Sequence, residues 1–354
     1  MLELTWTILL SVGLIHQTSG SDYLAELLKK HPTWSFELEN VESFIQRTLA
    51  YLGSSDVDTE DMLRARVSES LPLDMDHIPR KIDDPEWVSP QELPDSYDAR
   101  QKWKSCSHLL RDVQDEGVCH TDSPGIVSSV MADRYCIFTK GSFKEVLSQE
   151  MLVGCAEYCT QGSRLAQSWR YATSKGIPTG GGFNSGKGCL PYDHPPCRHT
   201  NGSYLHSPVE GGRHLKPCDE SFPYDHDCPK QCTNRKYSKS LDADRVKLET
   251  WYMLSRDESD IRRDIFAYGP VATFIIFTDQ LFDKPDGMYQ QKEGRRRIST
   301  FKCLKLIGWG DESNVKFWLA VNSWDSWGNK VFKIPRGSNY DLVESLPTTG
   351  IYFK

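Results

Sequence analysis

The chain has 354 residues, of which 38% are hydrophobic and 26% are charged, and its formal net charge is -7 at pH 7. This length and composition are typical of a globular protein with a packed core and room for more than one structural unit. The negative charge argues against binding to nucleic acid, and we interpret the short basic run at 294–298 as a solvated turn rather than a docking site for an acidic partner.

The first twenty residues contain an apolar run from Trp6 to Ile15 that is followed by small and polar residues. The run is too short to span a bilayer and is typical of a secretory signal cleaved near Gly20, although Glu3 stands where a basic residue is usual. We therefore predict a signal peptide at 1–20 and no membrane span.

The segment 21–92 follows the predicted signal. Apolar residues recur at three and four residue intervals in 21–31 and 41–53, which predicts two short amphipathic helices. The later part, from Asp56 to Glu92, is acidic, rich in proline and poor in aromatic side chains. We predict an extended connector there, because such a composition buries little apolar surface.

Helical patterns come first in the remainder of the chain, and strand patterns follow them. Ser123 and Pro124 are typical of a helix start, and apolar residues lie on one face of 125–138. A second helical pattern covers 164–176. Strand composition is found in four later runs, at 270–277, 301–310, 316–324 and 330–337. This order predicts an α+β body with two halves.

All eleven cysteines lie between Cys106 and Cys303, behind the predicted signal. This clustering predicts an oxidising compartment and a domain held by disulfides. Asn201 begins an Asn-Gly-Ser acceptor for N-glycosylation, which requires the same compartment and a surface position. The cysteine spacings do not form two similar short pairs, as structural zinc sites require, so we predict no metal site. No motif indicates a cofactor.

From Leu93 to the end the chain resembles the cathepsin B group of the papain family of cysteine proteases, and 21–92 resembles the propeptide of that group. The motifs that carry the resemblance are "LPDSYDARQKW" at 93–103, "DRYCIFT" at 133–139, "LIGWG" at 306–310, "NSW" at 322–324 and "FKIPRG" at 332–337. The resemblance implies a papain-like peptidase domain at 93–354, with a helical left lobe and a β-barrel right lobe. It also implies an enlarged occluding-loop-like insert at 191–232.

The resemblance also indicates where the chemistry of the family would take place. The nucleophilic cysteine position falls on Asp122, the histidine position on Lys302, and the glutamine that donates to the oxyanion on Glu116, while Asn322 is retained. A carboxylate is a poor nucleophile toward an amide, and an ammonium with an ordinary pKa of about 10.4 is poorly suited to proton transfer near neutrality. Glu116 would repel an oxyanion. The resemblance therefore implies a catalytically silent homologue.

The same residues have other interpretations. Asp122 and Lys302 would keep opposite charges together, and Asp122 is also fully explained as a helix cap. Cys303 is interpreted as a buried structural thiol rather than a displaced nucleophile, because neighbouring side chains on a strand face opposite ways. An acid and base pair made of Asp122 and Glu116 has no supporting motif.

The resemblance implies further binding positions and a set of disulfides. The Cys-Asn-Gly-Gly turn of the family falls on Ser163–Ala166, where side chains would narrow the substrate shelf. The substrate-binding positions are Arg164, Leu165, Ala166, His199, Trp324, Trp327 and Leu346. The implied disulfides are Cys106–Cys136, Cys155–Cys159, Cys189–Cys232 and Cys197–Cys218. Cys119 and Cys228 lose their usual partners, which fall on Ser163 and Gly154, and are either free or joined to each other.

Two functions remain open at this point. The first is a secreted or lysosomal binding module, monomeric and inactive, that holds a peptide, a protease inhibitor or another protein. The second is an active cysteine-type peptidase with a non-standard active site. Turnover of a dipeptide substrate would distinguish them.

Overall fold

The computed structural model describes residues 20–53, 57–71, 75–119, 121–157, 159, 164–198, 215–218, 227–278, 287–289, 298–324 and 330–352. In chain order the described helices are α1 (Gly20–Lys30), α2 (Val41–Leu52), α3 (Val57–Ser70), α4 (Ala99–Lys102), α5 (Ser107–Leu110), α6 (Ser123–Phe138), α7 (Gln149–Cys155), α8 (Leu165–Ser174), α9 (Leu241–Asp244) and α10 (Glu258–Tyr268). The strands are β1 (Ser35–Asn40), β2 (His77–Asp83), β3 (Tyr97–Asp98), β4 (Thr250–Leu254), β5 (Val271–Thr278), β6 (Ile298–Glu312), β7 (Val315–Val321), β8 (Val331–Pro335) and β9 (Thr348–Ile351).

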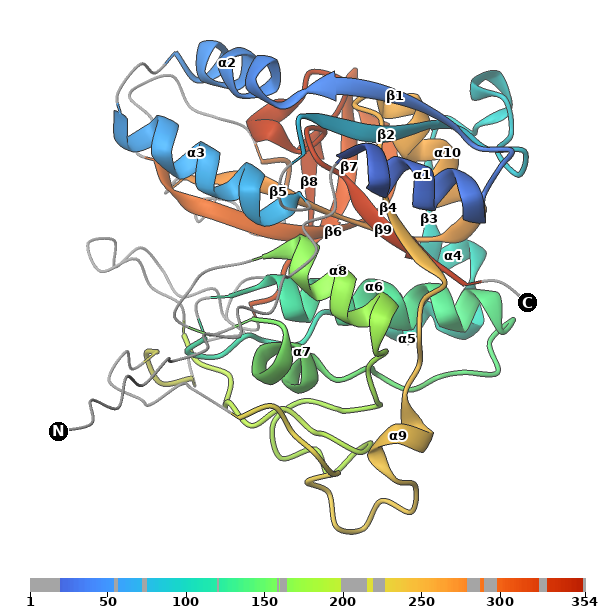
Figure 1. Ribbon diagram of the computed structural model, residues 1–354, viewed down its shortest axis with the longest axis vertical. Helices are drawn as coiled ribbons and strands as arrows, with labels where there is room; N and C mark the ends of the chain where they lie inside the picture. The colour runs from blue at the N-terminus through green and yellow to red at the C-terminus, as the bar shows by residue number, and fades with distance from the viewer. Residues whose placement is uncertain are drawn as a thin grey trace, which may run out of the picture.

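The described strands form one nine-stranded sheet in the order β1-β2-β4-β9-β5-β6-β7-β8, with β3 paired to β6. Figure 1 shows the sheet and α1 to α3 in the upper part of the molecule, with α5 to α8 gathered below. Most pairs are antiparallel, but β2 runs parallel to β4. The sheet therefore joins strands β1 and β2 of the N-terminal segment, residues 21–92, to strands from the rest of the chain.

Helix α6 runs through the centre of the molecule. It begins at Ser123 with Pro124 in its first turn, and most of its side chains are buried. It contacts the sheet on one side and α7 and α8 on the other. Helix α6 therefore lies between the sheet and the other helices, and its first turn is part of that junction.

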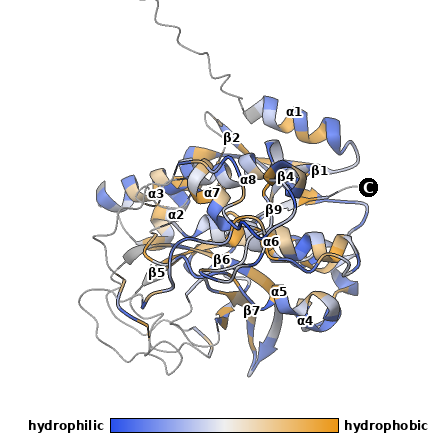
Figure 2. Ribbon diagram, turned by 90° about the horizontal axis from the view of Figure 1, so that it is seen from below, coloured by the Kyte–Doolittle hydropathy of each residue, from blue (hydrophilic) through white to orange (hydrophobic). Residues whose placement is uncertain are grey.

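The expected connector between Asp56 and Glu92 is wrong, because α3 and β2 lie within it. Leu63, Val67 and Leu71 recur every four residues and are buried against the rest of the molecule. The composition of the stretch from Asp56 to Glu92 is polar on average, but one narrow apolar face is enough to hold a helix once a partner surface is present. Helix α1, earlier in the N-terminal segment, also has hydrophilic and hydrophobic residues intermixed, as Figure 2 shows.

The four strand patterns correspond to β5, β6, β7 and β8. Strands β5 and β6 pair over most of their length, with Ile275 opposite Lys302 and Phe274 opposite Cys303. Further along β6, a Cβ at Gly308 would lie 2.1 Å from the carbonyl oxygen of Tyr97, so only glycine fits where β3 joins the sheet. None of the helices in the described ranges has the length and apolar character needed to cross a membrane.

Candidate active site

Asp122 lies directly before α6, at the N-cap position, and is 4% exposed. Its side chain makes no capping hydrogen bond in α6, all of whose residues are described. Instead, its Oδ2 accepts a hydrogen bond of 2.7 Å from the backbone N–H of Cys303 and lies 3.4 Å from Nζ of Lys302. The expected side-chain cap is therefore wrong, because the carboxylate faces β6 rather than the first turn of its own helix.

Lys302 and Glu116 form the shortest ion pair at this site. Nζ of Lys302 lies 2.8 Å from both carboxylate oxygens of Glu116. The same carboxylate accepts hydrogen bonds from Nε1 of Trp324 at 2.8 Å and from Oγ of Ser323 at 3.1 Å. The indole ring of Trp324 also covers the ammonium, with Nζ 4.2 Å from its centroid. Glu116 therefore has donors on both of its oxygens.

The charges of this cluster are buried together, since Lys302 is 3% exposed and Glu116 is 7% exposed. Burial by itself would lower the pKa of Lys302, but the carboxylates of Glu116 and Asp122 outweigh burial and raise the pKa above its ordinary value. Lys302 is therefore an ammonium at neutral pH. It holds its proton more tightly than a free lysine does.

Asn322 lies directly after β7 and is also buried. Its Oδ1 accepts a hydrogen bond of 3.3 Å from the backbone N–H of Trp324. Its Nδ2 has no hydrogen-bond partner among the described residues. The short contacts of Lys302 are with the carboxylate of Glu116 instead of with Asn322.

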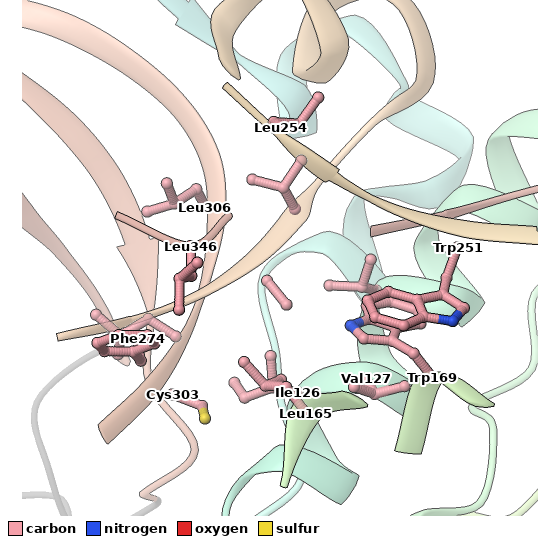
Figure 3. Packing of buried hydrophobic residues seen from close by; sticks show 14 of the residues in the cluster. Ile126, Val127, Leu165, Trp169, Trp251, Leu254, Phe274, Cys303, Leu306 and Leu346 are labelled. Atoms are coloured by element: carbon pink, nitrogen blue, oxygen red, sulfur yellow. The ribbon is translucent and has the colours of Figure 1, made fainter. Parts of the chain in front are cut away.

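Cys303 is the free cysteine of the chain and is 4% exposed. Figure 3 shows its side chain within the hydrophobic cluster that also holds Phe274, Ile126 and Leu165. Burial raises the pKa of the Cys303 thiol well above its ordinary value, and the charge of Asp122 raises it further. The thiol is therefore protonated and enclosed.

Glu157 is a buried group that the sequence did not single out. Its Oε2 accepts hydrogen bonds from Oγ1 of Thr121 at 2.6 Å, from Oγ of Ser123 at 2.5 Å and from the backbone N–H of Arg164 at 3.0 Å, while Oε1 accepts one from Ser168. Burial raises the pKa of Glu157, and the hydroxyl donors oppose that effect. This carboxyl therefore holds Thr121 and Ser123, the residues on both sides of Asp122, by hydrogen bonds. No sequence motif marks it, because its partners lie 7 to 36 residues away.

The disulfides differ from the expected set at one place. Cys106–Cys136, Cys189–Cys232 and Cys197–Cys218 are present as the resemblance implied. The expected Cys155–Cys159 bond is wrong, since the structure contains Cys119–Cys159 and Cys155–Cys228.

Both of the unexpected disulfides have ordinary Cα separations. The Cα atoms are 4.6 Å apart in each of the two long-range bonds, within the range that a disulfide spans. The segment around Cys228 lies against the end of α7, where a Cβ on Gly154 would be 3.0 Å from Pro229. Cys119 and Cys228 are therefore neither free nor joined to each other.

The expected binding positions are spread over different environments. Leu165 and Ala166 are core residues in the first turn of α8, and the backbone N–H of Arg164 donates to Ser123 and Glu157. Leu346 and Trp324 are buried. Asn201, His199, Trp327 and the turn residue Ser163 lie outside the described residues. Among the residues that the structure does describe, no group of three or more His, Cys, Asp or Glu side chains is arranged to hold a metal ion.

A sequence profile described as "Papain family cysteine protease" matches residues 93–349. The chain belongs to the papain family of cysteine proteases. Cathepsin B-like cysteine proteinase 1 of Ostertagia ostertagi is 30% identical over 275 residues, covering 75% of this chain and 76% of that protein. Cathepsin B-like cysteine proteinase 4 of Caenorhabditis elegans is 29% identical over 272 residues, covering 75% and 77%. The chain is a cathepsin B-like homologue within the family.

Solved structures of the family share the fold. Procathepsin B S9 from Trypanosoma congolense superposes with a TM-score of 0.60 at 23% identity, covering 77% of this chain and 82% of that chain. The proform of the Amb a 11 cysteine protease of ragweed pollen superposes with a TM-score of 0.50 at 18% identity, covering 77% and 69%. At these identities the likeness shows a papain-like cathepsin B fold with mixed helix and sheet content.

Proposed function

We propose that this homologue is catalytically inactive and serves as a scaffold that binds a peptide, a protease inhibitor or another protein. The observation that carries the proposal is the buried ion pair between Lys302 and Glu116, beside Asp122. By the resemblance, these three residues occupy the histidine, glutamine and cysteine positions of the family. The retained Asn322 is then the one family residue of the four.

The chemistry of these groups supports inactivity. Attack by the Asp122 carboxylate on an amide would form an anhydride while expelling a poor leaving group. Lys302 cannot readily give or take a proton near neutrality, because both neighbouring carboxylates raise its pKa. The carboxylate of Glu116 already has donors and would repel a developing oxyanion. Loss of one oxyanion donor alone lowers turnover by about 100- to 1,000-fold.

The disulfide at Cys119 suggests a different position for the substrate shelf. The resemblance places the usual partner of Cys119 at the first residue of the Cys-Asn-Gly-Gly turn, and that partner is Cys159. The turn then corresponds to "CTQG" at 159–162, which retains its last glycine. In this register the shelf ends before Leu165 and Ala166, which are core residues of α8.

The remaining assignments belong to the same proposal. A signal at 1–20, a propeptide-like segment at 21–92, a peptidase-like domain at 93–354 and an insert at 191–232 form a monomer that is secreted or lysosomal. Glycosylation at Asn201 fits that route. The disulfides support an oxidising compartment.

The alternative is an active peptidase with a non-standard nucleophile, for which Cys303 is the available thiol. Purified protein is assayed with a fluorogenic dipeptide and labelled with a thiol-directed epoxide, alongside a Cys303→Ser variant. We expect no turnover and no labelling of folded protein, and labelling of Cys303 only after unfolding. Robust turnover that disappears in Cys303→Ser would establish the alternative instead.

The binding role is tested separately from the absence of turnover. Immobilised folded protein is exposed to a displayed peptide library, and enrichment is compared with the same protein after reduction and unfolding. We expect selection of related peptides by the folded form only. Equal enrichment on both forms would contradict a specific binding surface.

A further inference from the structure

Lys81, in β2, is a charged side chain with no exposed surface. Its Nζ lies 2.8 Å from Oδ2 of Asp264 and 3.0 Å from Oδ2 of Asp84. Four aromatic rings surround the same ammonium at centroid distances of 4.1, 4.7, 3.9 and 5.2 Å, from Trp34, Trp87, Tyr252 and Tyr268. Two carboxylates and four ring faces thus enclose one cation, and we call this set the lysine cage.

The lysine cage is built from both parts of the chain. Lys81, Asp84 and two of the rings come from the N-terminal segment, residues 21–92. Tyr252 comes from β4, and Asp264 and Tyr268 come from α10. Asp264 also pairs with Arg134 of α6. A single buried carboxylate therefore links the N-terminal segment to the helix that begins next to the candidate active site.

Further buried contacts join the two parts around the cage. Strand β2 pairs in parallel with β4, with Lys81 opposite Leu254. Arg80 is also fully buried, and its Nη1 donates a hydrogen bond of 2.6 Å to the carbonyl oxygen of Ser345. Tyr23 of α1 donates one of 3.0 Å to the carbonyl oxygen of Trp251. The apolar residues of the N-terminal segment belong to the same core cluster as those of the sheet and α6.

We propose that the N-terminal segment is a permanent part of the folded protein, held by the lysine cage, and that it stays bound after the chain behind it is cut. Its removal would break the buried ion pair of Lys81 with Asp264, and breaking a buried ion pair is strongly unfavourable. It would also expose the rings of Tyr252 and Tyr268. The inference does not depend on whether the site at Asp122 is catalytic.

The test cuts the full-length chain at one place. Pro94, Asp95 and Ser96 are exposed between two buried residues, so a recognition sequence for a site-specific protease is inserted after Asp95. All cysteines follow this point in the chain, so no disulfide holds the two fragments together after cleavage. The cut protein, labelled with a dye at its N-terminus, is diluted at pH 7 into an excess of unlabelled cut protein. Exchange of the labelled segment measures its dissociation rate.

The decisive variant is Lys81→Met, which has a side chain of similar length without charge. Asp264 keeps Arg134 and the hydroxyl of Tyr252 as partners, and Asp84 keeps the hydroxyl of Tyr268, so neither carboxylate is left bare. The matched control is Lys29→Met, at an exposed lysine of α1 in the same segment. We expect the wild type and Lys29→Met to remain associated, and Lys81→Met to release the segment about 100-fold faster.

Release of the wild-type segment within the dead time would overturn the proposal. Equal rates for Lys81→Met and wild type would overturn the role of the lysine cage. If Lys81→Met does not fold, Asp84→Asn takes its place, because that variant removes one cage charge and leaves the pair of Lys81 with Asp264 intact. About tenfold faster release is expected for Asp84→Asn, and an unchanged rate would count against the cage.

Discussion

Replacement of Lys302 by methionine should destabilise the protein more than the same replacement of a surface lysine. The substitution removes the ammonium that lies 2.8 Å from both oxygens of Glu116 and 3.4 Å from Asp122. Methionine fills similar space but brings no donor. Two buried carboxylates of like charge then remain near each other without their common cation.

The magnitude follows from burial and from the remaining hydrogen bonds. Removing one partner of a buried ion pair costs about 3 to 5 kcal/mol of unfolding free energy. Glu116 keeps its neutral donors on Trp324 and Ser323, and Asp122 keeps the backbone N–H of Cys303. We therefore expect a loss near the lower end of that range, about 3 kcal/mol.

The assay is urea unfolding at pH 7, followed by tryptophan fluorescence. Lys333→Met is the matched control, because both Lys333 and its partner Glu312 are partly exposed and such pairs contribute at most about 1 kcal/mol. The double variant Lys302→Met with Glu116→Gln should recover part of the loss, since it removes the charge on both sides. A loss below about 1 kcal/mol for Lys302→Met would refute the view that these carboxylates are shielded from water.

Three further predictions concern the same site. Burial and the charge of Asp122 raise the pKa of Cys303, so a thiol reagent should find essentially no reactive thiol in folded protein. After unfolding without reductant it should find about one thiol per chain. Fast reaction of the folded form would contradict the enclosure of Cys303. The pKa of Lys302 is raised in the folded state, so its stabilising contribution is present below the ordinary value of about 10.4 and is lost as pH rises further. The stability difference between wild type and Lys302→Met should therefore shrink above about pH 10.4, and a constant difference would argue against this ion pair. The double variant Asp122→Cys with Lys302→His should have little peptidase activity. Adding Glu116→Gln should raise that activity about 100-fold, because glutamine can donate a hydrogen bond to the oxyanion. Full activity of the double variant would show that Glu116 does not prevent stabilisation of the oxyanion.

Much of the local structure could be predicted from the sequence. The helix after Asp122 and the strands β5 to β8 follow from short-range patterns that packing reinforces. The stretch from Asp56 to Glu92 could not be predicted in this way. Its average polarity favoured a connector, but the apolar face of α3 and the buried charges of β2 acquire partners only from distant segments.

The chain itself determined which side chains are available at the site: a carboxylate before α6, an ammonium on β6 and a second carboxylate at Glu116. Only the tertiary structure decided how they pair. Lys302 reaches Glu116 across 186 residues of chain and has its longer contact with Asp122. In the same way it joined Cys119 to Cys159 and enclosed Lys81 between two parts of the molecule. Local patterns carry information about neighbours along the chain, whereas a buried charge or thiol pairs with whichever partner folding brings within a few ångströms.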